Sequence, residues 1–179
     1  MSSPSMRDMI LDAAEKRIRA VGYNAVSFRE LAGDVGVKSA SIHYHFPQKV
    51  DLGVELVDRY SARFQERIDT IEIDDMKLAL EDYLSIYAAA LVLGESVCLC
   101  AILGAEANGL PRDISSKLQV FFEINETWLN SLFAHHGISA KAYPPLEILA
   151  SLEGSMIVAS SMQDRSVLDG SIQRILNFF

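Results

Sequence analysis

Residues 27–46 read SFRELAGDVGVKSASIHYHF, and this stretch decides how the chain folds. Ser27 followed three residues later by Glu30 has the spacing of a capping box, which predicts that a helix begins here. Gly36 can adopt a positive φ at little cost, so the short helix ends there and the chain turns. A second short helix is predicted over residues 38–45. Two helices of about two turns joined by a tight turn form a helix-turn-helix.

The second short helix is predicted to have two different faces. If Ile42 and Phe46 face the core, the geometry of a helix points Ala40 and Tyr44 away from it. Hydroxyl, imidazole and amine groups flank this outward face or lie at its ends, and they belong to Ser41, His43, His45, Lys38 and Lys49. Groups of this kind suit contacts with phosphates and base edges, and no carboxylate lies among them.

The rest of the chain repeats helical spacing of apolar residues, with no internal repeat and no alternating strand pattern of useful length. We therefore predict an all-α protein of about nine helices. Three short helices give way to longer ones near residue 47. This change divides the chain into a helix-turn-helix domain over residues 1–47 and a helical domain over residues 48–179.

The charges are distributed unevenly along the 179 residues. Residues 1–50 carry seven lysines and arginines against five acidic residues, a net charge of +2, and the remainder carries nine against nineteen, a net charge of −10. A mildly basic end on an acidic body fits a protein that offers only that end to DNA. The chain has neither an apolar run of about 18–20 residues nor an apolar signal segment, so a cytoplasmic protein without a membrane partner is expected.

Two runs of sequence carry a family resemblance. YNAVSFRELA at 23–32 and GVKSASIHYHFPQK at 36–49 resemble the two halves of the TetR-family signature, and the likeness covers roughly residues 7–53. The resemblance implies a DNA-binding transcriptional regulator that acts as a homodimer. It also implies that two recognition helices enter successive major grooves of operator DNA, about 34–36 Å apart.

The resemblance assigns DNA contacts by position. It implies phosphate contacts for Ser27, Tyr44, His45 and Lys49, and base-edge contacts for Lys38, Ser39, Ala40 and His43, beside Ser41. Arg29 is expected near either kind of group. Two positions depart from the family pattern: Phe28 stands where some members carry a base-contacting Arg, and Lys38 stands where Ser is frequent.

The resemblance further implies a ligand pocket in the helical body whose occupation moves the DNA-binding ends apart. We expect a repressor that a small, weakly polar ligand releases from its operator, because few ionisable residues interrupt the segment 97–105. An activator would have the same sequence features. Candidate pocket residues are Tyr83, Tyr87, Cys98, Phe121, Phe122 and Trp128, and the alternative interpretation is that they are ordinary core residues.

The last two helices are the expected dimer interface. Small residues such as Gly154 would let a partner backbone approach closely, and apolar residues would supply contact area. The residues predicted to face the partner are Leu152, Ser155, Met156, Ala159, Ile172 and Ile175. The alternative is that the small residues pack within the subunit.

Three other functions remain open from the sequence. A thiol-based regulator would sense electrophiles or oxidants through Cys98 or Cys100, which requires an accessible thiol with a lowered pKa. An enzyme is not expected, because the chain has no Gly-rich phosphate loop and no nucleophile elbow, and His135 with His136 is more typical of a solvated helix end. A ligand-independent architectural DNA binder is disfavoured by the acidic body. No cofactor is expected, and no metal, since His43 and His45 diverge on a helix.

Overall fold

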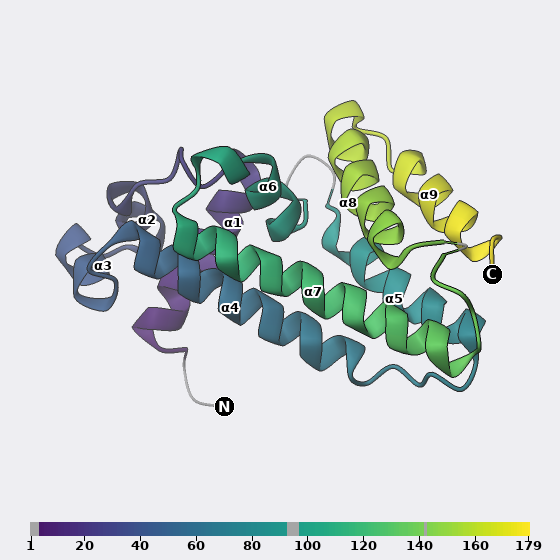
Figure 1. Cartoon of the computed structure of the whole chain (residues 1–179). Coiled ribbons are helices and arrows are strands. Elements are labelled where there is room, and N and C mark those ends of the chain that lie inside the picture. Colours follow the sequence, from purple (N-terminus) through teal and green to yellow (C-terminus); the bar gives the residue numbers. More distant parts are fainter. Residues whose placement is uncertain (1–3, 93–96, 142) are drawn as a thin grey trace.

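The computed structural model describes residues 4–92, 97–141 and 143–179, which form nine α-helices and one short 3₁₀ helix (Figure 1). The predicted all-α class is confirmed. In these ranges no helix has the length and apolar character needed to cross a bilayer. The elements in chain order are α1 (Met6–Val21), α2 (Phe28–Val35), α3 (Ser39–His45), α4 (Lys49–Ile68), α5 (Met76–Ala90), α6 (Leu99–Ala105), η1 (Ala107–Gly109), α7 (Arg112–His135), α8 (Pro145–Met162) and α9 (Ser166–Leu176).

Local signals begin and end the first helices as predicted. The Ser27 hydroxyl accepts a hydrogen bond from the Glu30 amide at 3.3 Å, and the Glu30 carboxylate accepts one from the Ser27 amide at 2.9 Å. Gly36 ends α2 in the left-handed region, with φ of 75°. Gly22 ends α1 with φ of 84° and ψ of 162°, a conformation open only to glycine. Ser27 and Gly36 thus fix the two ends of α2.

The first three helices form a small head at one end of the molecule (Figure 1). Its core contains Ile10, Leu31, Ile42 and Phe46, each fully buried. Beyond the head, α4 and α7 lie side by side along the body, and α8 packs against α9 at the opposite end. The body therefore connects the head to a second, distant pair of helices.

A buried polar centre lies between α5 and α7. The hydroxyls of Tyr83 and Tyr87 both donate to Oδ1 of Asn125, at 2.8 and 2.7 Å, and the Asn125 amide donates to the Phe121 carbonyl at 2.8 Å. Because every one of these buried groups has a partner, the centre fixes α5 against α7 without the cost of an unpaired polar atom.

The head and the body are in close contact. At Gly53 on α4, an added Cβ would clash with Ile114 of α7 and would lie 3.0 Å from the ring of Tyr23. Ion pairs also join α1 to α4, between Arg7 and Glu55 and between Arg59 and Asp12. Helix α1 therefore belongs to the head and also contacts the body through α4.

A further link reaches the head from the end of α6. The Glu106 carboxylate accepts hydrogen bonds from the backbone amide of Asn24 at 3.1 Å and from its side-chain amide at 3.0 Å. Asn24 lies in the turn between α1 and α2. The end of α6 is therefore hydrogen-bonded to the turn that precedes α2.

Candidate nucleic-acid interface

The two faces of α3 are arranged as the sequence predicts. Ile42 and Phe46 are 0% exposed and fix the helix on the head. Ala40 is exposed, and Tyr44 is 84% exposed, so its phenol projects into solvent. The Tyr44 ring meets the ring of His45 edge to face, with centroids 5.1 Å apart, and most of its surface is available to a partner.

His43 is held in place by two neighbours. Its ring meets the ring of Phe28 edge to face, with centroids 4.8 Å apart, and its Nδ1 lies 3.4 Å from the Pro47 carbonyl oxygen. Phe28 lies at the start of α2, so this contact also joins the two helices of the motif. Phe28, where the sequence departs from the family pattern, therefore packs against a predicted base-edge residue.

Both acidic residues of α2 pair with one arginine of α1. Arg17 on α1 contacts Asp34 at 2.6 Å and Glu30 at 3.5 Å. Hydrogen bonds from Ser27 lower the pKa of Glu30, and the Arg17 guanidinium lowers the pKa of Asp34. Arg29 is exposed and has no ion-pair partner in the described part of the chain. Its positive charge is therefore not cancelled locally.

Ser27 is less free than the resemblance implies. Its hydroxyl donates to the Glu30 carboxylate at 2.8 Å while it caps α2. Lys38 is exposed at the start of α3, whereas Ser39, Ser41 and His45 are partly buried along it. The outward groups with the greatest freedom are thus Lys38 and Tyr44.

Lys49 has a structural contact as well as an accessible charge. Its ammonium lies 4.3 Å from the centre of the Tyr23 ring and donates to the Asn24 carbonyl at 3.4 Å. Partial burial lowers its pKa. The ammonium is thus held beside α3 at the first residue of α4, where a phosphate following the groove edge could meet it.

The six predicted pocket residues occupy the core of the body. Tyr83, Tyr87, Cys98 and Phe121 are buried, and Phe122 and Trp128 are partly buried. Trp128 stacks on Tyr83 with ring centroids 5.0 Å apart. It also borders a surface hollow between α4 and α7. The structure therefore packs these aromatic residues against one another.

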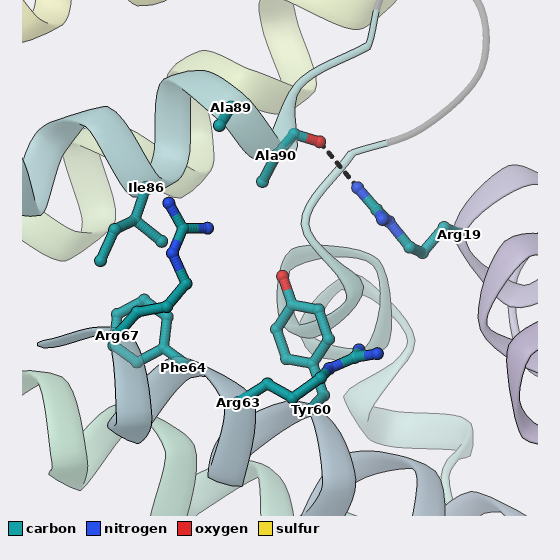
Figure 2. Close-up of a pocket in the computed structure, with 8 residues that line it drawn as sticks. All are labelled: Arg19, Tyr60, Arg63, Phe64, Arg67, Ile86, Ala89 and Ala90. Carbon is teal, nitrogen blue, oxygen red and sulfur yellow. Dashed lines mark hydrogen bonds between the residues drawn. The ribbon is translucent and has the colours of Figure 1, made fainter. Parts of the chain in front are cut away.

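A cavity of about 310 Å³ lies beside this aromatic core (Figure 2). Three arginines line it, Arg19 from α1 and Arg63 and Arg67 from α4, together with apolar residues of α4 and α5. None of the six predicted pocket residues lines this cavity. Arg63 and Arg67 could not be predicted as site residues, because their spacing on α4 is also typical of a solvated helix face.

The two thiols are enclosed. Cys98 is 1% exposed and Cys100 is 0% exposed. Burial opposes ionisation of Cys98, but hydrogen bonds from Cys100 and from the Tyr60 hydroxyl, 3.4 Å away, outweigh it and lower the pKa of Cys98 to about 6. Burial raises the pKa of Cys100. A lowered pKa without access does not favour the thiol-based alternative.

Most of the residues predicted for the dimer interface must be corrected. Leu152, Met156 and Ala159 are 0% exposed and Ile175 is 1% exposed, because they form the core between α8 and its neighbours. They are not available to a partner, and Ser155 and Ile172 are only partly exposed. The exposed apolar residues of α8 lie on another face and are Leu146, Ile157, Val158 and Met162.

The remaining histidines lie at a helix end. The His136 Nε2 is 2.7 Å from the Ile73 carbonyl oxygen, and the His135 Nε2 is 3.7 Å from Asp74. Both contacts join the end of α7 to the segment before α5. In the described part of the chain no three histidine, cysteine or acidic side chains cluster as metal ligands do.

Comparisons with known proteins agree with this geometry. Residues 10–56 match the family described as bacterial regulatory proteins, tetR family, a range that contains α2 and α3. An HTH-type transcriptional regulator of Lactococcus lactis subsp. lactis is 22% identical over 97% of this chain and 92% of its own. A nucleoid occlusion factor SlmA of Vibrio campbellii is 28% identical over 84% of this chain and 81% of its own.

Solved structures resemble the whole chain. A TetR transcriptional regulator from Legionella pneumophila has a TM-score of 0.93 and 26% identity, with 100% of both chains covered. A TetR-family regulator from Agrobacterium tumefaciens has a TM-score of 0.87 and 27% identity, with 97% of this chain and 96% of that chain covered. The likeness thus extends beyond the head to the helical body.

Proposed function

We propose that this chain is a homodimeric repressor of the TetR family of bacterial transcriptional regulators, and that a small ligand releases it from operator DNA. The observation that supports the proposal most is the surface of α3. Ile42 and Phe46 anchor the helix, Tyr44 projects from it into solvent, and Lys38 is exposed at its N-cap; the sequence of α3 contains no carboxylate. The family and the fold are those of DNA-binding regulators and not of enzymes.

The proposed contacts divide into two kinds. Lys49, Tyr44 and His45 would hold phosphates, with a smaller contribution from Ser27, because its hydroxyl already caps α2. The first turns of α3 would approach the base edges, where readout uses short polar and apolar side chains. These residues are Lys38, Ser39, Ala40 and His43, with Ser41 beside them, and Arg29 would contact either phosphate or base.

A dimer would place two such heads on one duplex. The exposed apolar residues of α8 provide a surface for a second copy, since Val158 is 45% exposed and Met162 is 64% exposed. The same patch on both subunits would form an isologous contact. Gly154 is exposed on α8, and an added Cβ would meet no atom of its own subunit within 4 Å, so a partner helix could approach closely there.

Release by a ligand would follow from differential binding. A ligand that binds the conformation with incompatible head spacing more tightly shifts the population away from the DNA-bound state. The contacts of α1 with α4 and of Glu106 with Asn24 join the body to the head, so a change in the body has a route to α2. This route supports ligand control in preference to constant occupancy of the operator.

Selection of sites from a pool of random duplexes by the purified protein tests the proposal. We expect an inverted repeat whose half-sites lie about one helical turn apart. Arg29→Ala should weaken binding to the selected site, and Arg112→Ala, an exposed arginine at the start of α7, serves as the matched control. A monomer in solution, or equal affinity for selected and random duplexes, would contradict the proposal.

A further inference from the structure

The cavity between α1, α4 and α5 combines positive charge with an apolar wall (Figure 2). The guanidinium groups of Arg19, Arg63 and Arg67 lie around it, and Phe64 and Ile86 provide the apolar side. Its volume of about 310 Å³ is at the lower end of the range for small-molecule sites. The cavity therefore suits a small molecule with one charged end.

The charges around the cavity do not balance. Glu15 on α1 is the carboxylate that meets these arginines, at 2.5 Å from Arg63 and 3.7 Å from Arg19. Arg67 has no carboxylate within 4.0 Å in the ranges that the structure describes, although Asp82 lies with it around a neighbouring hollow. One carboxylate against three guanidinium groups leaves an excess of positive charge at the cavity.

Arg19 is held firmly, which makes the site rigid on one side. Its Nε donates to the Val97 carbonyl and its Nη2 to the Ala90 carbonyl, both at 2.7 Å. Figure 2 shows Arg67 reaching toward Ile86 on α5, with the Tyr60 phenol between the arginines. Arg19 is fixed by these two hydrogen bonds and Arg63 by its ion pair with Glu15, whereas the Arg67 guanidinium has no ion pair among the described residues and is available to an anionic group.

We propose that this cavity binds a small organic anion, an aromatic or aliphatic body carrying one carboxylate or phosphate group. The anionic group pairs with Arg67 and Arg63, and the body packs on Phe64 and Ile86. A weakly polar ligand, as expected from the segment 97–105, would leave the excess positive charge uncompensated.

The position of Glu15 connects this site to the head. This step rests on the proposed function, because it concerns release of DNA. An anion on Arg63 competes with Glu15 for the same guanidinium, and that ion pair joins α1 to α4. Occupation of the cavity thus weakens the ion pair that holds α1, a helix of the head, against α4.

Calorimetric titration of the full-length protein tests the inference with four probes: phenylacetate, phenyl phosphate, inorganic phosphate and the uncharged phenylacetamide. Each is used at about 5 mM, where a ligand with a dissociation constant of about 1 mM occupies most sites. We expect phenylacetate or phenyl phosphate to bind, and phenylacetamide not to. The two charged aromatic probes distinguish a carboxylate from a phosphate ligand, and inorganic phosphate shows whether the apolar body contributes.

Variants locate the binding. Arg67→Gln should weaken the affinity for the charged probe by about tenfold or more, which is the loss expected for one charge-assisted hydrogen bond. Glu15→Gln should raise the affinity for the charged probe, because the competing carboxylate is removed. Arg112→Gln, on the exposed start of α7, should have no effect. Circular dichroism confirms that each variant is folded.

Three results would overturn the inference: equal binding of phenylacetamide, unchanged affinity in Arg67→Gln, or no binding of any charged probe. Operator binding without any probe is measured in parallel. If operator binding is normal while no charged probe binds, only the proposed ligand class is wrong. If the charged probes bind and no duplex is recognised, the proposed function fails and the anion site stands.

Discussion

The ring of Phe28 lies edge to face against the ring of His43 at an interplanar angle of 71°, and Nδ1 of that imidazole lies 3.4 Å from the carbonyl oxygen of Pro47. A carbonyl oxygen only accepts hydrogen bonds, so the Nδ1 atom carries the proton in this contact. In the neutral imidazole Nε2 is then an acceptor. An acceptor in the major groove pairs with the amino group of adenine or cytosine.

His43→Ala should therefore change operator preference more than overall affinity. We expect a loss of about 1–3 kcal/mol at one base pair and little change on random duplexes. Fluorescence anisotropy with single-base variants of the selected operator measures this. His135→Ala, an exposed histidine at the far end of α7, is the control. A loss of equal size on every duplex would show that His43 reads no base.

Lys49→Gln should weaken binding to all duplexes alike. Its ammonium is held beside α3 by the Tyr23 ring and the Asn24 carbonyl, and a phosphate contact from this place carries no sequence information. The slope of log affinity against log salt concentration should become shallower by about one unit. Lys117→Gln, on the body, should leave the slope unchanged. If the salt dependence of Lys49→Gln equals that of the wild type, Lys49 does not contact a phosphate.

Gly22→Ala should destabilise the protein. The φ of 84° and ψ of 162° cost about 1–3 kcal/mol for a residue with a Cβ, and the new methyl would also clash with the Glu106 carboxylate. Urea denaturation measures the free energy of unfolding. Gly33→Ala is the matched control, because Gly33 lies inside α2 with open space around it and should gain stability of about 0.5–1 kcal/mol. A neutral Gly22→Ala would show that the turn between α1 and α2 can rearrange.

Glu153→Gln should alter the pH dependence of stability. Burial and the neighbouring Cys98 raise the pKa of Glu153 well above 4.5 in the folded protein, and neither carboxyl oxygen has a hydrogen-bond partner among the described residues. Below about pH 4.5 the carboxyl is protonated in both the folded and the unfolded state. Above it only the unfolded chain ionises, so wild-type stability falls as the pH rises toward the folded pKa.

The difference between the two proteins isolates this effect. The stability of the wild type relative to Glu153→Gln should decline by about 1.4 kcal/mol for each pH unit between the two pKa values and then level off. Urea denaturation at a series of pH values measures it. A constant difference from about pH 4 to pH 8 would mean that Glu153 ionises equally easily in both states.

Val158→Glu should dissociate the proposed dimer. Val158 is 45% exposed on α8, so a glutamate is tolerated in the free subunit but would bring two like charges together across an isologous contact. Sedimentation velocity should show the monomer and a large loss of operator affinity. Leu78→Glu, at a position 59% exposed on α5, is the control. A dimer that persists in Val158→Glu would place the interface on another surface.

The helix-turn-helix could be predicted from the sequence because its signals are local. The capping box of Ser27 and Glu30, the positive φ of Gly36 and the inward face of Ile42 and Phe46 each depend on neighbours within a few residues. Local rules of this kind do not require the rest of the chain to be placed first. The orientation of Tyr44 followed from the same geometry.

The cavity and the partner-facing surface could not be predicted in this way. Arg63 and Arg67 are one helical turn apart on α4, and only the packing of α1 and α5 turns that stripe into a cavity wall. On α8 apolar residues occur on nearly every side, so periodicity does not separate Leu152, which faces its own subunit, from Val158, which does not. Both features depend on tertiary contacts that a single helix does not encode.

The absence of a side chain at Gly53 has a mechanical consequence. Tyr23 of the head and Ile114 of α7 both approach α4 there, so α4 is closely packed at this residue. Arg67 lies 14 residues further along, about 21 Å at the rise of an α-helix. A tilt of α4 about Gly53 would therefore displace Arg67 further than the residues near the head. A small rotation of α4 at Gly53 would thus produce a larger displacement of the cavity wall at Arg67.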